Sequence, residues 1–130
     1  MTRTVDVMSE RPTTVTPRAT VESAIQLLER LEIRHLPVVN ESGELVGMLS
    51  DRDLRGTLGA DGGPPGSARI VDIMNGDVIQ ALADDDVIDI AELMVDNKIG
   101  AVPIVDERGV LVGIVSYVDI LRSMIDERKQ

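Results

Sequence analysis

The sequence contains no cysteine, no tryptophan and no phenylalanine, and Tyr117 is its only tyrosine. Without cysteine the chain can form neither disulfides nor thiolate metal sites, so nothing indicates a secreted disulfide scaffold. Because aromatic residues are nearly absent, Val, Ile, Leu, Met and Ala must fill the interior. Hydrophobic residues make up 43% of the chain, which is enough for a packed core.

Long hydrophobic runs are also missing. The longest unbroken apolar run covers residues 110–115, whereas a membrane-spanning helix needs about 20 residues. Residues 1–12 are polar and charged and lack the apolar stretch of a signal peptide. We therefore expect a soluble, cytoplasmic protein with no membrane partner.

Positive charge is scarce. The chain has 13 Lys and Arg residues against 23 Asp and Glu residues, for a net charge of −10. General binding to nucleic acid requires clustered basic residues, so we expect no nucleic-acid partner. Residues 1–65 carry a net charge of −3 and residues 66–130 carry −7. An anionic ligand would therefore be repelled less by the first half of the chain than by the second.

An internal repeat dominates the sequence. Residues 5–55 align with residues 71–121 at a constant offset of 66 without a gap, and 15 of the 51 pairs are identical. Unrelated sequences of ordinary composition would match at roughly 6% of positions, or about three pairs. The chain is therefore an internal duplication.

Each copy has the same predicted order of elements. Apolar residues at helical spacing predict helices over 20–31 and 86–97, with Thr20 and Asp86 as N-caps. Short apolar runs on either side of a turn that ends in glycine predict two hairpins, with strands 36–39 and 45–49, then 102–105 and 110–115.

A further helix is expected after each hairpin. In the first copy it is cut short at Gly56, before the linker rich in Gly and Pro, and in the second copy an apolar stripe runs from Tyr117 to Ile125. We expect repeat 1 over residues 1–58, a linker over 59–68 and repeat 2 over 69–130.

One copy of about 50 residues would bury too little surface alone. The predicted fold is therefore mixed α/β (α+β), with two tandem β-α-β-β-α repeats packed sheet to sheet. Pseudo-two-fold symmetry between the copies would create two equivalent clefts, and small ligands usually bind in such clefts.

Three paired motifs carry a resemblance to a known family. They are Val-Asp-Val-Met (5–8) with Val-Asp-Ile-Met (71–74), His-Leu-Pro-Val-Val (35–39) with Ala-Val-Pro-Ile-Val (101–105), and Gly-Met-Leu-Ser-Asp-Arg-Asp (47–53) with Gly-Ile-Val-Ser-Tyr-Val-Asp (113–119). In this order and register the chain resembles a tandem CBS-domain pair, or Bateman module, of the stand-alone bacterial type. The resemblance implies a regulatory protein that binds AMP, ADP, ATP or a related adenosyl ligand.

The resemblance also implies which residues contact the ligand. In the family the segment Gly-x-x-Ser/Thr-x-x-Asp ends a strand and begins a helix, where the hydroxyl approaches phosphate and the Asp binds the ribose. Ser50 and Asp53 would serve one site, and Ser116 and Asp119 the other. The alternative from the residues alone is that each serine is only an N-cap and each aspartate only stabilises the first turn.

Further contacts are expected from the segments around the two prolines. By resemblance, the strands at Leu36-Pro37 and Val102-Pro103 would line the adenine pocket, although core packing is the alternative. Arg34 and His35 precede the first proline and resemble phosphate-binding positions, whereas Gly100 and Ala101 stand in the second copy. We therefore expect the Asp53 site to prefer phosphorylated ligands. The acidic run 84–86 in the second copy lacks the spacing of a calcium loop. We expect this run to lie near the Asp119 site, which would bind anionic ligands more weakly or take a less anionic adenosine derivative.

Two other functions remain open. A protein-interaction module that acts by docking to a regulated partner is the main alternative, and Met124 and Ile125, which would be exposed if the chain were monomeric, would suit such a surface. By resemblance we also expect a homodimer. Catalysis is disfavoured, because the chain has one histidine, no cysteine and no pair of carboxylates in divergent environments. We expect no catalytic residue, no metal site and no catalytic cofactor.

Overall fold

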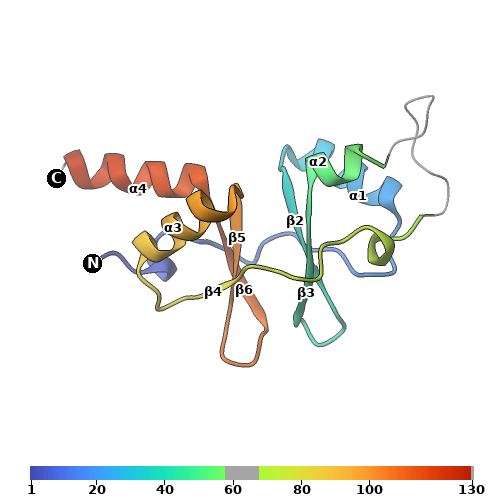
Figure 1. The fold of residues 1–130 in the computed structure, drawn as a ribbon, viewed down its shortest axis with the longest axis horizontal. Coiled ribbons are helices and arrows are strands. Elements are labelled where there is room, and N and C mark those ends of the chain that lie inside the picture. The colour runs from blue at the N-terminus through green and yellow to red at the C-terminus, as the bar shows by residue number, and fades with distance from the viewer. Residues whose placement is uncertain (58–67, 130) are drawn as a thin grey trace. The chain divides into compact units, whose positions relative to one another are not determined.

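The computed structural model describes residues 1–57 and 68–129, so the expected linker over 59–68 lies outside the described residues except at residue 68. The chain divides into two units. Unit 1 consists of Met1–Pro12 and Ile79–Gln130, and unit 2 consists of Thr13–Val78. Figure 1 traces the elements of each unit along the chain.

Unit 2 is built from a hairpin and two helices. Its elements are α1 (Val21–Leu31), β2 (His35–Val39), β3 (Leu45–Ser50), α2 (Asp51–Arg55) and the 3-10 turn η2 (Ile70–Asp72). Strands β2 and β3 pair antiparallel. Single bridges extend this sheet on both sides, with Val15 parallel to Val38 and Asn75 antiparallel to Met48.

Unit 1 repeats this plan with longer edge strands. Its elements are η1 (Thr4–Asp6), β1 (Ser9–Glu10), β4 (Ala81–Leu82), α3 (Val87–Asn97), β5 (Ala101–Val105), β6 (Leu111–Ser116) and α4 (Tyr117–Lys129). The sheet order is β1-β6-β5-β4, in which β4 and β5 are parallel and the other neighbours antiparallel. The mixed α/β class and the two repeats predicted from the sequence are confirmed.

Both long helices begin where the sequence predicts. The Thr20 hydroxyl accepts a hydrogen bond from the Ser23 backbone N–H at 3.1 Å, and the Asp86 carboxylate accepts one from Ile88 at 3.0 Å. These caps pair backbone donors that the first helical turn leaves free. The helices end at Glu32 and Lys98, both with a φ of 55°, in the left-handed conformation that closes helices.

The two hairpin turns depend on glycine and on an amide or carboxylate. Gly43 has a φ of 80° and Gly109 a φ of 84°, a conformation that glycine adopts without a steric penalty. The Asn40 and Asp106 side chains accept backbone hydrogen bonds across these turns. Hydrogen bonds from the backbone of Val110 and Arg108 also lower the pKa of the Asp106 carboxyl.

Each unit contains the opening segment of the other sequence repeat. In unit 1 the Thr4 N–H donates to the Asp85 carbonyl at 2.9 Å, and in unit 2 the Ile70 N–H donates to the Ala19 carbonyl at 2.9 Å. The sequence repeats and the structural units therefore have different boundaries, because residues 1–12 pack with the second repeat and residues 68–78 with the first.

Each unit has its own aliphatic core. The buried core of unit 2 consists of Val15, Val21, Ala24, Leu28, Leu36, Val38, Leu49, Leu54 and Ile70. The buried core of unit 1 consists of Ala81, Ile90, Met94, Val102, Ile104 and Val115. No helix among the described residues is long and apolar enough to cross a membrane.

Candidate ligand sites at the starts of α2 and α4

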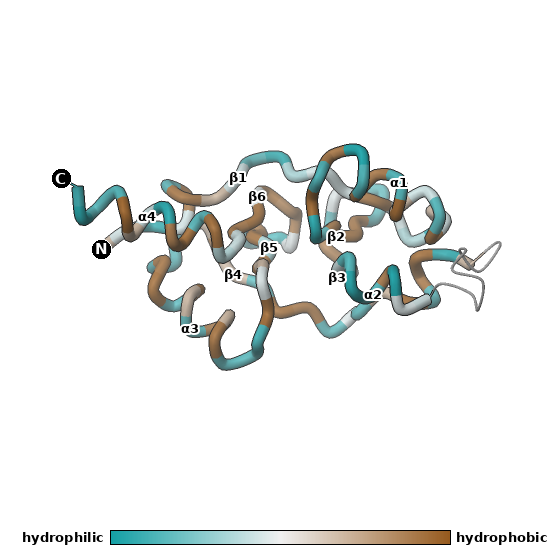
Figure 2. Tube along the Cα trace, turned by 90° about the horizontal axis from the view of Figure 1, so that it is seen from above, coloured by the Kyte–Doolittle hydropathy of each residue, from teal (hydrophilic) through white to brown (hydrophobic). Residues whose placement is uncertain are grey.

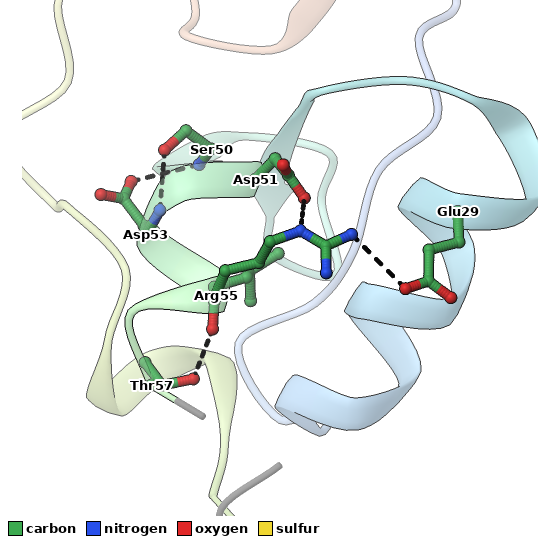
Figure 3. A network of polar contacts seen from close by, with 7 residues as sticks. Glu29, Ser50, Asp51, Asp53, Arg55 and Thr57 are labelled. Atoms are coloured by element: carbon green, nitrogen blue, oxygen red, sulfur yellow. Dashed lines mark hydrogen bonds and ion pairs between the residues drawn. The ribbon is translucent and has the colours of Figure 1, made fainter. Parts of the chain in front are cut away.

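The strand-to-helix junction of unit 2 holds Ser50 and Asp53 in a reciprocal pair of hydrogen bonds. The Ser50 Oγ accepts from the Asp53 backbone N–H at 3.0 Å, and the Ser50 N–H donates to Asp53 Oδ2 at 3.1 Å (Figure 3). This capping box fixes the start of α2. The capping role weighed from the sequence is therefore present.

Unit 1 has the same junction at the start of α4. The Ser116 N–H donates to Asp119 Oδ2 at 2.8 Å, and the Asp119 N–H donates to Ser116 Oγ at 3.3 Å. The sequence alone predicts two equivalent serine–aspartate pairs, and the structure brings both pairs together.

The capping boxes leave binding capacity unused. Oδ1 of Asp53 and Oδ1 of Asp119 take part in no hydrogen bond with the described residues. A carboxylate oxygen has two acceptor positions, and a serine hydroxyl that accepts can still donate its own hydrogen. Each junction can therefore accept hydrogen bonds from a diol and donate one to an anion while the helix start stays intact.

Arg34 and His35 lie at the same end of the hairpin as Ser50. His35 is paired with Ser50 across the strands, and the Asp51 N–H donates to the Arg34 carbonyl at 2.7 Å. Burial lowers the pKa of His35, and the neighbouring Asp53 carboxylate partly opposes this effect. The structure thus brings Arg34, His35, Ser50 and Asp53 together in unit 2.

The corresponding end of unit 1 has no basic residue at these two positions. Gly100 and Ala101 stand there, and the Tyr117 N–H donates to the Gly100 carbonyl at 3.1 Å. The acidic run 84–86 lies at the opposite end of α3 from Gly100, and an 11-residue helix is roughly 16 Å long. These carboxylates therefore do not form part of the α4 junction, contrary to the sequence-based expectation.

The four strand residues expected at the adenine pocket are all buried. Leu36 and Val102 are each 0% exposed and belong to the cores of their units. Their side chains are core residues, which leaves only their backbone for a ligand. Pro37 and Pro103 are also buried, and side-chain alternation places them on the other face of each strand.

Unit 1 also has an open pocket of about 550 Å³ that the sequence does not predict. It is lined by apolar residues of β4, β5 and β6 and by Asp84, Asp106, Glu107 and Arg108. These residues gather at the turn of the β5–β6 hairpin, at the end away from Ser116. The pocket is therefore separate from the α4 junction. Among the described residues, no group of three or more His, Asp or Glu side chains is placed to hold a metal ion.

Comparison with known proteins identifies the family. The CBS domain family matches residues 5–59 and again residues 70–126. The chain belongs to the CBS domain family. The resemblance noted in the sequence is thereby confirmed, and each match covers one Gly-x-x-Ser-x-x-Asp segment.

Two solved CBS proteins are similar along almost the whole chain. A CBS domain pair crystallised with 5′-methylthioadenosine and S-adenosyl-L-methionine is 32% identical, with a TM-score of 0.87 over 98% of both chains. The protein CBSX2, crystallised with AMP, is 25% identical, with a TM-score of 0.89 over 98% of this chain and 99% of that one.

Curated relatives include much longer proteins. The homoserine O-acetyltransferase of Methanococcoides burtonii is 33% identical over 93% of this CBS chain, but the match spans 24% of that enzyme. The chain covers between 21% and 24% of the first four such relatives. The likeness therefore concerns less than a quarter of each relative's length.

Proposed function

We propose that this CBS protein is a regulatory module that binds an adenosine-containing ligand at the starts of α2 and α4. The observation that carries the proposal is the duplicated junction, in which a serine hydroxyl and an aspartate carboxylate are hydrogen-bonded into the same helix start twice. The crystallised relatives with AMP, 5′-methylthioadenosine and S-adenosyl-L-methionine support the ligand class.

Each residue at a junction has a proposed role. Oδ1 of Asp53 or Asp119 accepts hydrogen bonds from the two ribose hydroxyls, and the hydroxyl of Ser50 or Ser116 donates to phosphate or its equivalent. Backbone groups of the Leu36-Pro37 and Val102-Pro103 segments contact the adenine ring. The adenine slot is aliphatic, since the chain offers only one aromatic residue other than His35.

Calorimetric titration with AMP, ADP, ATP and S-adenosylmethionine tests the proposal directly. We expect at least one of them to bind with micromolar to millimolar affinity and to raise the melting temperature by mass action. GMP serves as a matched control for the base. If none of the adenine ligands gives heat or a thermal shift at millimolar concentration, the proposal fails and docking alone remains.

We further propose that the Asp53 site prefers phosphorylated ligands. Arg34 is exposed beside this site and can form a charge-assisted hydrogen bond with phosphate, whereas Gly100 occupies its place in unit 1. Arg34→Ala should therefore weaken AMP binding by about tenfold while leaving adenosine unchanged. Arg30→Ala, an exposed arginine of the same unit, is the control. Equal losses for AMP and adenosine would contradict the preference.

Regulation implies an output other than catalysis. We propose that the chain is not an enzyme, because Asp53 and Asp119 occupy equivalent positions and not the divergent environments of an acid–base pair. The output is then a regulated partner protein.

We also propose a homodimer, since Met124 and Ile125 are 60% and 54% exposed on α4. Docking without a ligand is the alternative function that this exposed helix favours.

A further inference from the structure

Asparagine followed directly by glycine occurs once in the sequence, at Asn75-Gly76. The other two asparagines are followed by larger residues, Asn40 by a glutamate and Asn97 by a lysine. Asn75 and Gly76 are both exposed and lie in the segment that follows η2 in unit 2. In Figure 2 the chain is hydrophilic here and becomes hydrophobic on its way to β4. Solvent water therefore reaches both residues of the Asn-Gly pair.

The backbone of Asn75 is held against β3. The Met48 N–H donates to the Asn75 carbonyl at 3.1 Å, and the Asn75 N–H donates to the Met48 carbonyl at 3.3 Å. Residues that exchange two such hydrogen bonds in an antiparallel pair direct their side chains to the same face of the sheet. The Asn75 side chain therefore lies on the face of unit 2 that carries Met48 and, two residues further along β3, Ser50.

The side chain of Asn75 is folded back over the peptide bond to Gly76. Asn75 Oδ1 accepts a hydrogen bond from the Asp77 N–H at 3.1 Å, which is the geometry of an Asx turn. The ring that this hydrogen bond closes contains both the amide carbon Cγ and the Gly76 nitrogen. The hydrogen bond also draws electron density from the carbonyl, so Asn75 Cγ is held near the Gly76 nitrogen as an electrophile.

The Gly76 nitrogen is available as a nucleophile. Its N–H donates to no backbone carbonyl among the residues that the structure describes. A Cβ added at Gly76 would come no closer than 3.9 Å to any neighbour, so little packs against this peptide. Because glycine also has the greatest backbone freedom, the Gly76 nitrogen can turn towards Asn75 Cγ.

The other two asparagines lack this combination. Asn40 forms a similar turn, but its Nδ2 donates to Glu44 at 3.0 Å. Asn97 lies at the end of α3, where its Nδ2 donates to the Leu93 carbonyl at 2.9 Å and the N–H of Lys98 caps the helix. In both cases the amide group that would leave is hydrogen-bonded, and the next residue carries a Cβ.

We propose that Asn75 is a site of spontaneous deamidation in the folded protein, with Gly76 as the attacking residue. The Gly76 nitrogen forms a bond to Asn75 Cγ, the bond from Cγ to Nδ2 breaks, and ammonia leaves with the proton of the Gly76 N–H. Water then opens the resulting cyclic imide at one of its two carbonyl carbons. The carbon attacked gains the hydroxyl of water, and the glycine nitrogen regains a proton.

The two directions of ring opening give different products. Opening at Cγ gives aspartate, and opening at the main-chain carbonyl gives isoaspartate, in which the chain continues through the former side chain. Either product adds a negative charge at the edge of the sheet beside Met48, and isoaspartate also adds a methylene to the main chain. Unit 1 is not altered, because Ser9 and Glu10 of β1 occupy the matched positions. Deamidation therefore changes unit 2 as the protein ages, whether or not a ligand binds.

Peptide mass spectrometry on the full chain, kept folded in neutral buffer, tests the proposal. A urea-denatured sample is incubated in parallel until its Asn75 has reacted, and it sets the length of the experiment. We expect isoaspartate and aspartate at position 75 of the folded chain. Asn40 and Asn97 should react at least about tenfold more slowly, which corresponds to about 1.4 kcal/mol of activation free energy.

Three results would overturn the proposal. Asn75 could remain an amide in the folded chain while the denatured chain reacts, which would show that the fold prevents the attack. Aspartate could form without isoaspartate, which would indicate direct hydrolysis by water. Asn40 or Asn97 could react as fast as Asn75, which would show that the local geometry has no effect.

Two variants test the role of glycine. Gly76→Ala should slow the reaction at least about tenfold, because the added methyl group hinders the attacking nitrogen. Asp77→Ala keeps the backbone N–H that holds Asn75 Oδ1, so it should leave the rate unchanged. Denaturant unfolding checks that both variants are folded. A Gly76→Ala chain that reacts as fast as the wild type, or an Asp77→Ala chain that does not react, would contradict the assigned roles.

Discussion

Asp53 and Asp119 each use one carboxylate oxygen for the helix start, and the other has no hydrogen bond to the part of the chain that the structure describes. An alanine substitution removes both functions together, so it cannot separate a ligand contact from a cap. Glutamate can separate them, because Glu is the usual partner of serine in a capping box. The extra methylene keeps the cap within reach but shifts the carboxylate relative to a bound ribose.

We expect Asp53→Glu and Asp119→Glu to keep the melting temperature within a few degrees of the wild type and to weaken adenosine binding by about tenfold or more at the altered site. Asp53→Ala should lower both, since loss of a cap costs about 1 kcal/mol. Paired thermal melts and calorimetry provide the measurement. Unchanged affinity in both glutamate variants would show that these residues are only caps.

We expect His35 to make the proposed unit 2 site sensitive to pH. Burial lowers its pKa below the ordinary value of 6.5; the Asp53 carboxylate opposes this shift, Arg34 adds to it, and Asp51 also opposes it. The lowered pKa favours the neutral imidazole of His35 in the free protein. A bound phosphate would favour the imidazolium form and raise that pKa again.

AMP affinity should therefore rise as the pH falls from 8 to 6, with proton uptake on binding, and adenosine should show neither effect. Calorimetry in two buffers of different ionisation enthalpy measures the uptake, and His35→Gln should abolish it. The folding stability of the free protein should depend on pH in the opposite direction to AMP affinity. A lowered folded-state pKa means that stability is full above 6.5 and falls as the pH drops below it. Equal heats in both buffers would exclude His35 as a phosphate contact.

At the scale of elements, the opening segment of each repeat packs a methionine side chain against a strand glycine. Met8 packs on Gly113, and Met74 packs on Gly47. A Cβ added at Gly113 would lie 2.5 Å from Met8 Sδ and 3.1 Å from the Ser9 carbonyl oxygen. One added at Gly47 would lie 2.6 Å from Met74 Sδ, with no backbone atom among its nearest neighbours. The absent side chain of each glycine provides the space for the methionine.

Gly113→Ala should therefore destabilise the protein by about 1–3 kcal/mol, and Gly47→Ala by less, because a methionine side chain moves more easily than a carbonyl. Denaturant unfolding measures both. Gly76→Ala is the control, since its added Cβ would come no closer than 3.9 Å to any neighbour. If Gly113→Ala is as stable as Gly76→Ala, the methionine contact does not hold the segment.

The same elements show how far the sequence predicts the structure. The helices, hairpins and serine–aspartate pairs follow from local sequence patterns. Examples are the Thr20 cap, the glycine at position 43 of the hairpin turn and the repeat at an offset of 66 residues. The exchange of opening segments does not, because the contacts of Thr4 with Asp85 join residues 81 positions apart. The expectation that the 84–86 run lies near the Asp119 site is also wrong, since α3 separates the run from the start of α4.

The stripe on α4 shows a second limit. Tyr117, Leu121, Met124 and Ile125 have the spacing of a buried helix face, yet all four are exposed. Helical periodicity identifies an apolar side but not what covers it. The exposure of these four side chains therefore had to come from the structure.

At the scale of the whole molecule, the N-terminal segment belongs to unit 1 although 66 residues separate it from the remainder of that unit. Thr4 is fully buried there, and Arg3 forms an ion pair with Asp84. Strand β1 completes one edge of the sheet. Unit 1 therefore depends on residues from both ends of the chain.

Removal of residues 1–10 should destabilise unit 1 by several kcal/mol, or about the cost of losing a buried side chain and its hydrogen bonds. Hydrogen exchange should lose protection in β5 and β6 while β2 and β3 keep theirs. Removal of the three C-terminal residues is the control. Equal loss of protection in both hairpins would show that the two units unfold together.

The exchange of opening segments between the two repeats also implies an order in which the two units can be completed during synthesis. Unit 2 is continuous from Thr13 to Val78, whereas unit 1 is completed only by Ile79–Gln130. At about 5–20 residues per second, the N-terminal segment leaves the ribosome several seconds before its packing partners exist. We therefore expect unit 2 to fold first on the nascent chain. The hydrophobic side chains of Val5, Val7 and Met8 remain available to chaperones until the last strands emerge.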